Sequence, residues 1–224
     1  MAAKPNRFDE YYNSCSGNPN FASEEFKSSG SANATSISAK KVILNGAHVV
    51  EGDVNAETLE SNGSLKVGGS LHAFYVSLAG SASVQKAIVS KRLSSSGSLF
   101  AGSVSVDLLE VRGSIRSTGV SADTVTWHGG GSVEEVKTRR ISLNTTGGGR
   151  VTLVGFNLGG SRGPDVSRLV ASDCAVIGPA RIQYLRSRQV ELLKGASVEK
   201  VEYVETFKSH KGVSLGSDPV KVDQ

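Results

Sequence analysis

The stretch GSLKVGGSLHAFYVSLA, Gly63 to Ala79, is followed directly by another Gly-Ser step at Gly80. Similar glycines, which begin a Gly-Ser or Gly-Ala step, recur along the chain at this same spacing, give or take one position. They are Gly46, Gly63, Gly80, Gly97, Gly113 and Gly131, and further on Gly178, Gly195 and Gly212 keep the spacing of the first glycines. Self-similarity at a short fixed period is the signature of a solenoid, in which each repeat stacks on the last.

Apolar residues occupy the same places within successive units. Three columns are formed by Val50, Val67 and Val84, by Val54, Leu71 and Ile88, and by Leu59, Val76 and Leu93. Each apolar position lies in a short segment bounded by Gly, Ser, Asn or charged residues, which is too short for a helix and fits a short strand. A unit of three such strands and three bends predicts one coil of a parallel β-helix, whose strands pair with those of the next coil.

The predicted fold class is therefore all-β, a parallel β-helix of about nine to ten coils that covers residues 37–218. Residues 1–36 lack the period and are rich in Ser, Asn and Gly, so we expect a disordered, flexible N-terminal tail. The unit that runs from Gly149 to Gly178 is much longer than one period, which places a loop insertion near residues 155–166. Residues 219–224 are expected to form a short C-terminal tail.

Two finer expectations concern the register of the coils. The column glycines fit the bends, where a positive φ or the close approach of successive backbones excludes a Cβ, and the triplet that ends at Gly131 is assigned to such a corner. The unit after Gly97 is one residue short, so we expect the register to adjust and bring Val104 and Leu109 or Val111 inside.

Composition excludes several classes of protein. The two cysteines, Cys15 and Cys174, have no CxxC or Cys/His cluster around them, so neither a disulfide framework nor a zinc site is expected. The formal charge is only +4 and the arginines are scattered, so no nucleic-acid partner is expected. MAAKPNRFDEYYNS has no apolar core and no stretch is long enough to span a bilayer, so the predicted compartment is the cytoplasm, with membrane contact left open.

The aligned columns do not predict an enzyme. Asp53, Glu57 and Glu60 align with neutral or basic residues in the next units, so no acidic stack of the kind that acts on sugars is expected. The four histidines are expected at solvated or corner positions, which argues against a hexapeptide acyltransferase. GFNLGGSR lacks the Lys of a phosphate-binding loop, and no cofactor is predicted. A β-helical carbohydrate-active enzyme is the least favoured alternative.

The stretch VEGDVNAETLESNGSLKVGGSLHAFYVSLAGSASV, Val50 to Val84, has G-x-[VL] steps at Gly52, Gly63 and Gly69 and resembles the bactofilins, the polymer-forming cytoskeletal proteins. The resemblance covers the central core and rests on the repeat pattern. It implies a right-handed β-helical core with flexible tails, whose coils stack end to end into nucleotide-independent filaments. The chain departs from the family in its larger number of coils, in the insertion, and in lacking the short apolar N-terminal segment of many members.

The ends of such a stack carry the predicted function, because unpaired backbone groups and apolar core side chains there form a template for another chain. The predicted self-assembly residues are Val42, Ile43 and Leu44 in the first coil and Val201, Tyr203, Val204 and Phe207 in the last complete coil. We expect a second copy of the chain as the main partner, in filaments that scaffold other proteins. The alternative is a non-polymerising module whose basic side, within residues 131–224, binds an acidic partner.

Overall fold

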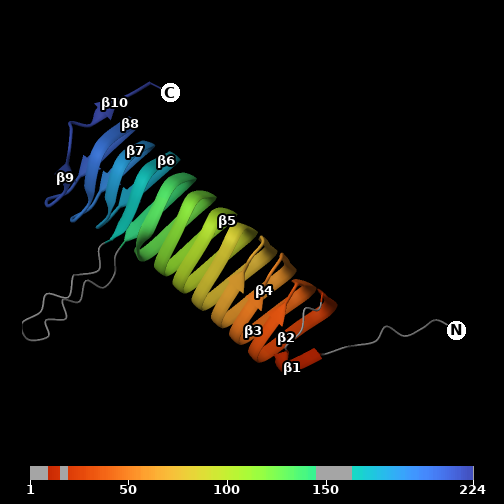
Figure 1. Ribbon diagram of the computed structural model, residues 1–224. Coiled ribbons are helices and arrows are strands. Elements are labelled where there is room, and N and C mark those ends of the chain that lie inside the picture. Colours follow the sequence, from red (N-terminus) through yellow and green to blue (C-terminus); the bar gives the residue numbers. More distant parts are fainter. Residues whose placement is uncertain (1–9, 16–19, 145–162, 224) are drawn as a thin grey trace, which may run out of the picture. The chain divides into compact units, whose positions relative to one another are not determined.

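A computed structural model describes residues 10–15, 20–144 and 163–223. Every regular element in these ranges is a β-strand, and the strands pair in parallel along the chain (Figure 1). Within the same ranges the strands follow a β-solenoid of about 11 turns with a repeat of roughly seventeen positions. The predicted all-β fold of stacked parallel coils is thus confirmed. The chain divides into two compact units, residues 1–102 and residues 103–224.

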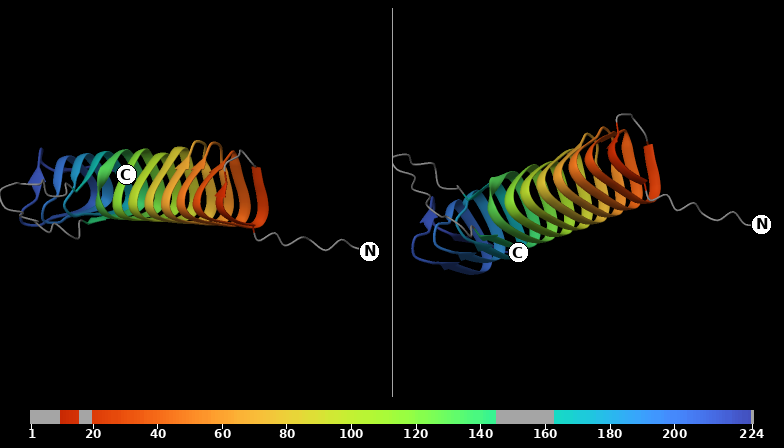
Figure 2. Two further views of the ribbon diagram at one scale, coloured as in Figure 1. Left: turned by 60° about the horizontal axis from the view of Figure 1, so that its bottom comes forward. Right: turned by 90° about the horizontal axis from the view of Figure 1, so that it is seen from below.

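Parallel pairing between successive coils builds the first unit. It contains β1 (Glu10–Cys15), β2 (Asn20–Ala34), β3 (Ser36–Val50), β4 (Val54–Val67) and the first part of β5 (Leu71–Asn144). Phe26 pairs with Val42 and Val42 pairs with Leu59, so the second of these coils is slightly longer than the first. Because each coil pairs along most of its length, these coils lie directly on one another in both views of Figure 2.

The core of the first unit is built from pairs of inward residues on each of three sides of a coil. In β3 the inward residues are Ile37, Ala39, Val42, Leu44, His48 and Val50. One outward residue separates the two members of each pair, because side chains alternate along a strand, and the alternation restarts after each bend. Val50, Val67 and Val84 are paired neighbours in successive coils and all are buried, which confirms the predicted column.

From β2 onward, a glycine occupies one bend of each coil in this unit. Gly46, Gly63, Gly80 and Gly97 have positive φ angles, between 109° and 129°. A Cβ at Gly63 would collide with the carbonyl oxygen of Gly46 in the preceding coil. Only glycine combines this backbone conformation with so close an approach, so the predicted corner role of these glycines is confirmed.

The N-terminal boundary of the coils differs from the prediction. Residues 10–15 and 20–34, assigned to a disordered tail, form β1 and β2, and β2 pairs with both β1 and β3. The aromatic ring of Phe26 is an inward residue, only 2% exposed. Other buried side chains of this coil are Ser28, Ala32 and Ala34. These residues are polar or small and do not display the apolar period, which is why the sequence did not reveal the coil. Residues 1–9 and 16–19 of the predicted tail lie outside the described part.

The second unit continues the same pairing with slightly shorter coils. It contains the rest of β5, then β6 (Pro164–Ile177), β7 (Arg181–Leu192), β8 (Ser197–Ser209), β9 (Ser214–Leu215) and β10 (Val220–Lys221). Val166 pairs with Ile182 and Ile182 with Val198, and all three are buried. The shortened unit after Gly97 adjusts as predicted, because both Val104 and Leu109 are buried. Val111 is buried with them.

In the second unit, the corner glycine differs from the prediction, and the predicted insertion lies only partly within the described residues. Gly129, and not Gly131, faces Gly113, so the coil between these two glycines is shorter than predicted. A run of three glycines can place any member opposite the preceding corner, and the stacking of the flanking strands decides which one. Residues 155–162 of the predicted insertion lie outside the described part, whereas Pro164 and Val166 are buried in β6.

The C-terminal boundary also differs from the prediction. Val220 and Lys221, assigned to a tail, form the short strand β10 and pair with Glu202 and Tyr203 of β8. The backbone N–H of Val222 adds a hydrogen bond of 2.8 Å to the carbonyl of Tyr203. Parallel pairing with the preceding coil therefore extends beyond residue 218, although the sequence there lacks the apolar period.

The corner glycines yield a first test. We expect Gly63→Ala to lower the free energy of unfolding by at least about 2 kcal/mol, because the new methyl group meets backbone and the φ of 129° disfavours any L side chain. Gly119→Ala is the matched control, since nothing lies within 4 Å of the position of its Cβ. Urea unfolding measures both variants. Equal stability of the two would contradict the proposed role of the glycine column.

Candidate functional site

The last coil of the second unit is only partly covered by the strands that follow it. β9 pairs with Ser197 and Val198, and β10 pairs with Glu202 and Tyr203. On the third side of this coil, from Val204 to Ser209, one edge of β8 pairs with β7, where Phe207 lies opposite Val190. Within residues 163–223, no strand pairs with the opposite edge of β8 over these residues. The segment Val204 to Ser209 therefore leaves a row of backbone donors and acceptors open, which can pair with another strand.

Three of the four predicted C-terminal assembly residues gather at this open edge. Tyr203, Val204 and Phe207 are half-buried, whereas Val201 is completely buried and belongs to the core. The ring centroids of Tyr203 and Phe207 lie 5.6 Å apart, with 34° between the ring planes. Phe207 follows the buried Val190 in its column. It is therefore a core residue by position that lacks a covering coil within the described residues.

The predicted N-terminal assembly residues are not at an end of the stack. Val42 and Leu44 are completely buried, and Ile43 is half-buried. All three belong to β3, which β2 covers. The edge that precedes these coils belongs to β1, which pairs with β2 from Glu10 onward. The prediction placed the first coil too late because the inward residues of β2 do not show the apolar pattern.

Charged side chains on neighbouring coils of the second unit neutralise one another. Glu135, Arg168, Tyr184 and Lys200 occupy one outward column in consecutive coils. The guanidinium of Arg168 lies 3.7 Å from a carboxylate oxygen of Glu135 and 5.2 Å from the centroid of the Tyr184 ring. In the following coil, the Nζ of Lys200 lies 5.6 Å from the same centroid. Basic residues here are thus engaged within the fold.

The carboxylate of Glu202 contacts two residues of the outward column that contains Arg168. The hydroxyl of Tyr184 donates a hydrogen bond of 2.6 Å to Glu202, and Lys200 forms an ion pair of 2.9 Å with the same carboxylate. These two contacts lower the pKa of Glu202, whereas burial, followed by the bond to Glu202, raises the pKa of Tyr184. The hydroxyl remains a donor at neutral pH, so this contact ties β7 to the last coil.

A second set of ion pairs includes Asp173, the residue before Cys174. Arg140 lies 2.8 Å from Asp173, and Arg188 lies 3.5 Å from Glu205. Burial, and then the charge of Asp173, raise the pKa of the Cys174 thiol. The thiol is therefore protonated at neutral pH, which disfavours a role as nucleophile. Together with the Arg168 column, these pairs leave less free positive charge for an acidic partner than the sequence suggested.

The histidines were expected at solvated or corner positions, and His48 is the exception. His72 and His210 are exposed and His128 is half-buried, but His48 is an inward residue with 3% exposure. Its Nε2 lies 2.9 Å from the hydroxyl oxygen of Ser28 in β2. Within the described residues, its Nδ1 is buried without a hydrogen-bond partner. Burial lowers the pKa of His48 below its ordinary value of 6.5.

No family model, curated protein or solved structure matches the chain. In the part of the chain that the structure describes, no group of three or more His, Cys, Asp or Glu side chains could hold a metal ion. Over the same residues, no helix is long and apolar enough to cross a membrane. The open edge of β8 and the side chains around Phe207 form the candidate functional site, on the geometry given above.

The stability of the protein at acid pH tests the burial of His48 in the core. Because its pKa is lowered in the folded state, the unfolded chain binds this proton more readily, and stability is lost as the pH falls below about 6.5. We expect His48→Leu, which matches Leu65 in the next coil, to reduce this loss. Urea unfolding at a series of pH values measures the effect. His72→Leu, at an exposed position, is the control and should retain the acid sensitivity of the parent.

Proposed function

We propose that this chain is a structural protein of the bactofilin kind, which assembles with copies of itself through the ends of its coils into filaments that scaffold other proteins. The observation that supports this proposal is the open edge of β8 beside the half-buried Tyr203, Val204 and Phe207. An added strand would satisfy the open backbone groups and remove these side chains from water. No nucleotide is required, because the contact repeats the one that already joins successive coils.

The chemistry of this contact favours a second copy of the chain over an unrelated partner. Within each unit, one coil covers the next by parallel pairing in a nearly constant register. A strand at the edge of another copy, such as β1, which precedes β2, can continue the same parallel pairing. β9 and β10 already pair with two sides of β8, so the incoming strand needs to pair only with Val204 to Ser209. We place these filaments in the cytoplasm, as the sequence suggests.

A charge at the open edge tests the proposal. Phe207→Arg should convert sedimenting polymer into soluble protein, because an added strand would then bury a guanidinium without a partner. Phe100→Arg is the matched control, since Phe100 is 45% exposed on an outward position of the first unit and should tolerate the charge. Sedimentation and negative-stain microscopy without nucleotide measure assembly, and circular dichroism confirms that both variants fold.

Two results would contradict this assignment. If the parent protein stays soluble at all concentrations and forms no filaments, self-assembly is not its function. If the parent polymerises and Phe207→Arg polymerises equally well, the filament exists but the edge of β8 does not build it.

A further inference from the structure

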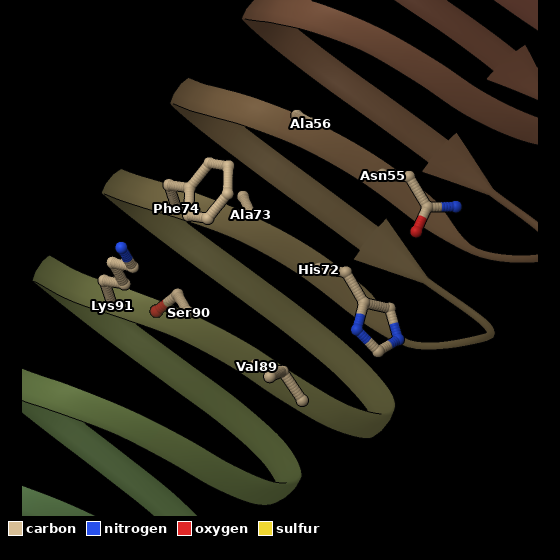
Figure 3. A pocket seen from close by; sticks show the side chains of 8 residues that line it. All are labelled: Asn55, Ala56, His72, Ala73, Phe74, Val89, Ser90 and Lys91. Atoms are coloured by element: carbon tan, nitrogen blue, oxygen red, sulfur yellow. The ribbon is translucent and has the colours of Figure 1, made fainter.

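The first unit carries a pocket that the proposed filament contact does not use. Its volume is 370 Å³, and residues from three successive coils line it (Figure 3). The lining residues are Asn55, Ala56, His72, Ala73, Phe74, Val89, Ser90 and Lys91. This volume lies within the range of ligand-binding clefts, and most of the lining is apolar. The pocket belongs to a single copy of the chain, so it exists whether or not filaments form.

The columns of the coil explain why the surface is hollowed here. Ala56 and Ala73 are paired inward residues beside a bend, and Ser90 lies one period further along the chain. Their side chains are small and line the pocket. Phe74 stands at the bend itself and forms one wall of the pocket, as Figure 3 shows. Pairing between coils thus places small residues above one another at this bend, whereas in other columns it places large apolar residues above one another.

Two apolar side chains of the pocket lie largely in water. Phe74 is 50% exposed and Val89 is 41% exposed, although an outward position could have held a polar residue. Exposed apolar side chains that line one concave site are typical of a binding surface. A ligand side chain seated between them would remove both from water. The pocket therefore selects for an apolar group of about the size of one large side chain.

The charge beside the pocket selects for an anion. The Nζ of Lys91 lies 5.1 Å from the centroid of the Phe74 ring, and within the described residues it takes part in no ion pair. Glu57 occupies the same position one coil before Phe74, so Phe74 lies between it and Lys91 in this column. The hydroxyl oxygen of Ser90 is buried without a hydrogen-bond partner in the described part of the chain. A carboxylate next to the apolar group would pair with the ammonium of Lys91.

We propose that this pocket docks a peptide segment of a partner protein, in which a large apolar side chain lies next to a carboxylate. The apolar side chain fills the space between Phe74 and Val89, and the carboxylate faces Lys91. A single ammonium group and a recess of this size suit one short segment, whereas binding to an anionic membrane requires several basic residues on one face. This docking would give a scaffold its cargo, but it does not depend on polymerisation.

Selection from a displayed library of short random peptides tests the proposal, with the purified full chain immobilised as bait. Peptides enriched on the parent should carry Leu, Phe or Trp next to Asp or Glu. Enrichment should fall about tenfold on Phe74→Ser, which removes the apolar contact, and on Lys91→Glu, which removes the ionic contact. On Lys91→Glu the selected peptides should exchange their acidic residue for Lys or Arg. Tyr75→Ser is the matched control and should leave the enrichment unchanged, since Tyr75 is exposed but does not line the pocket.

Several outcomes would overturn the docking proposal without affecting the filament. These are no enrichment on the parent, enrichment without acidic residues, or equal enrichment on Lys91→Glu. Flotation with phosphatidylglycerol vesicles provides a second readout, and binding that requires Lys91 there, with no selected peptide, would assign the pocket to a lipid surface. The Phe207→Arg variant should retain peptide binding, so that loss of assembly and loss of docking remain separate results.

Discussion

Parallel backbone pairing between coils is the constraint on which the rest of this structure depends. Each coil must place its N–H and C=O groups opposite those of the next, because the chain contains no other regular structure in its described residues. A nearly constant coil length follows from this requirement. Glycine at the bend and small or apolar residues inside are consequences of it, since successive backbones approach too closely at Gly46 and Gly63 to admit a side chain.

The same pairing makes the ends of the coils different from their middle. A residue such as Val190 is buried because a coil covers it, whereas Phe207, the next residue of that column, is half-exposed because none of the described strands covers it. Position in the stack, and not residue type, decides which inward side chain can contact another molecule. For this reason Val42 and Leu44 belong to the core although they begin the clear apolar period.

Stacking also determines which polar side chains meet on the surface, because an outward residue lies beside the residue that it pairs with in the next coil. Charges of opposite sign in adjacent coils, as at Glu135 and Arg168, neutralise each other and stabilise the pairing of their strands. Where small residues stack at a bend, as at Ala56 and Ala73, a pocket forms instead. One repeat thus generates ladders that stabilise the coils and recesses that can bind a partner.

The sequence by itself determined the period, the all-β coil, the corner glycines and the gathering of Tyr203 and Phe207 in the last coil, because these follow from spacing along the chain. Tertiary structure decided the rest. The coil of Phe26, the burial of His48 and the choice of Gly129 over Gly131 depend on contact with a neighbouring coil. Such contacts can impose a strand on residues that carry no periodic signal, because the neighbour supplies both the hydrogen bonds and the apolar surface.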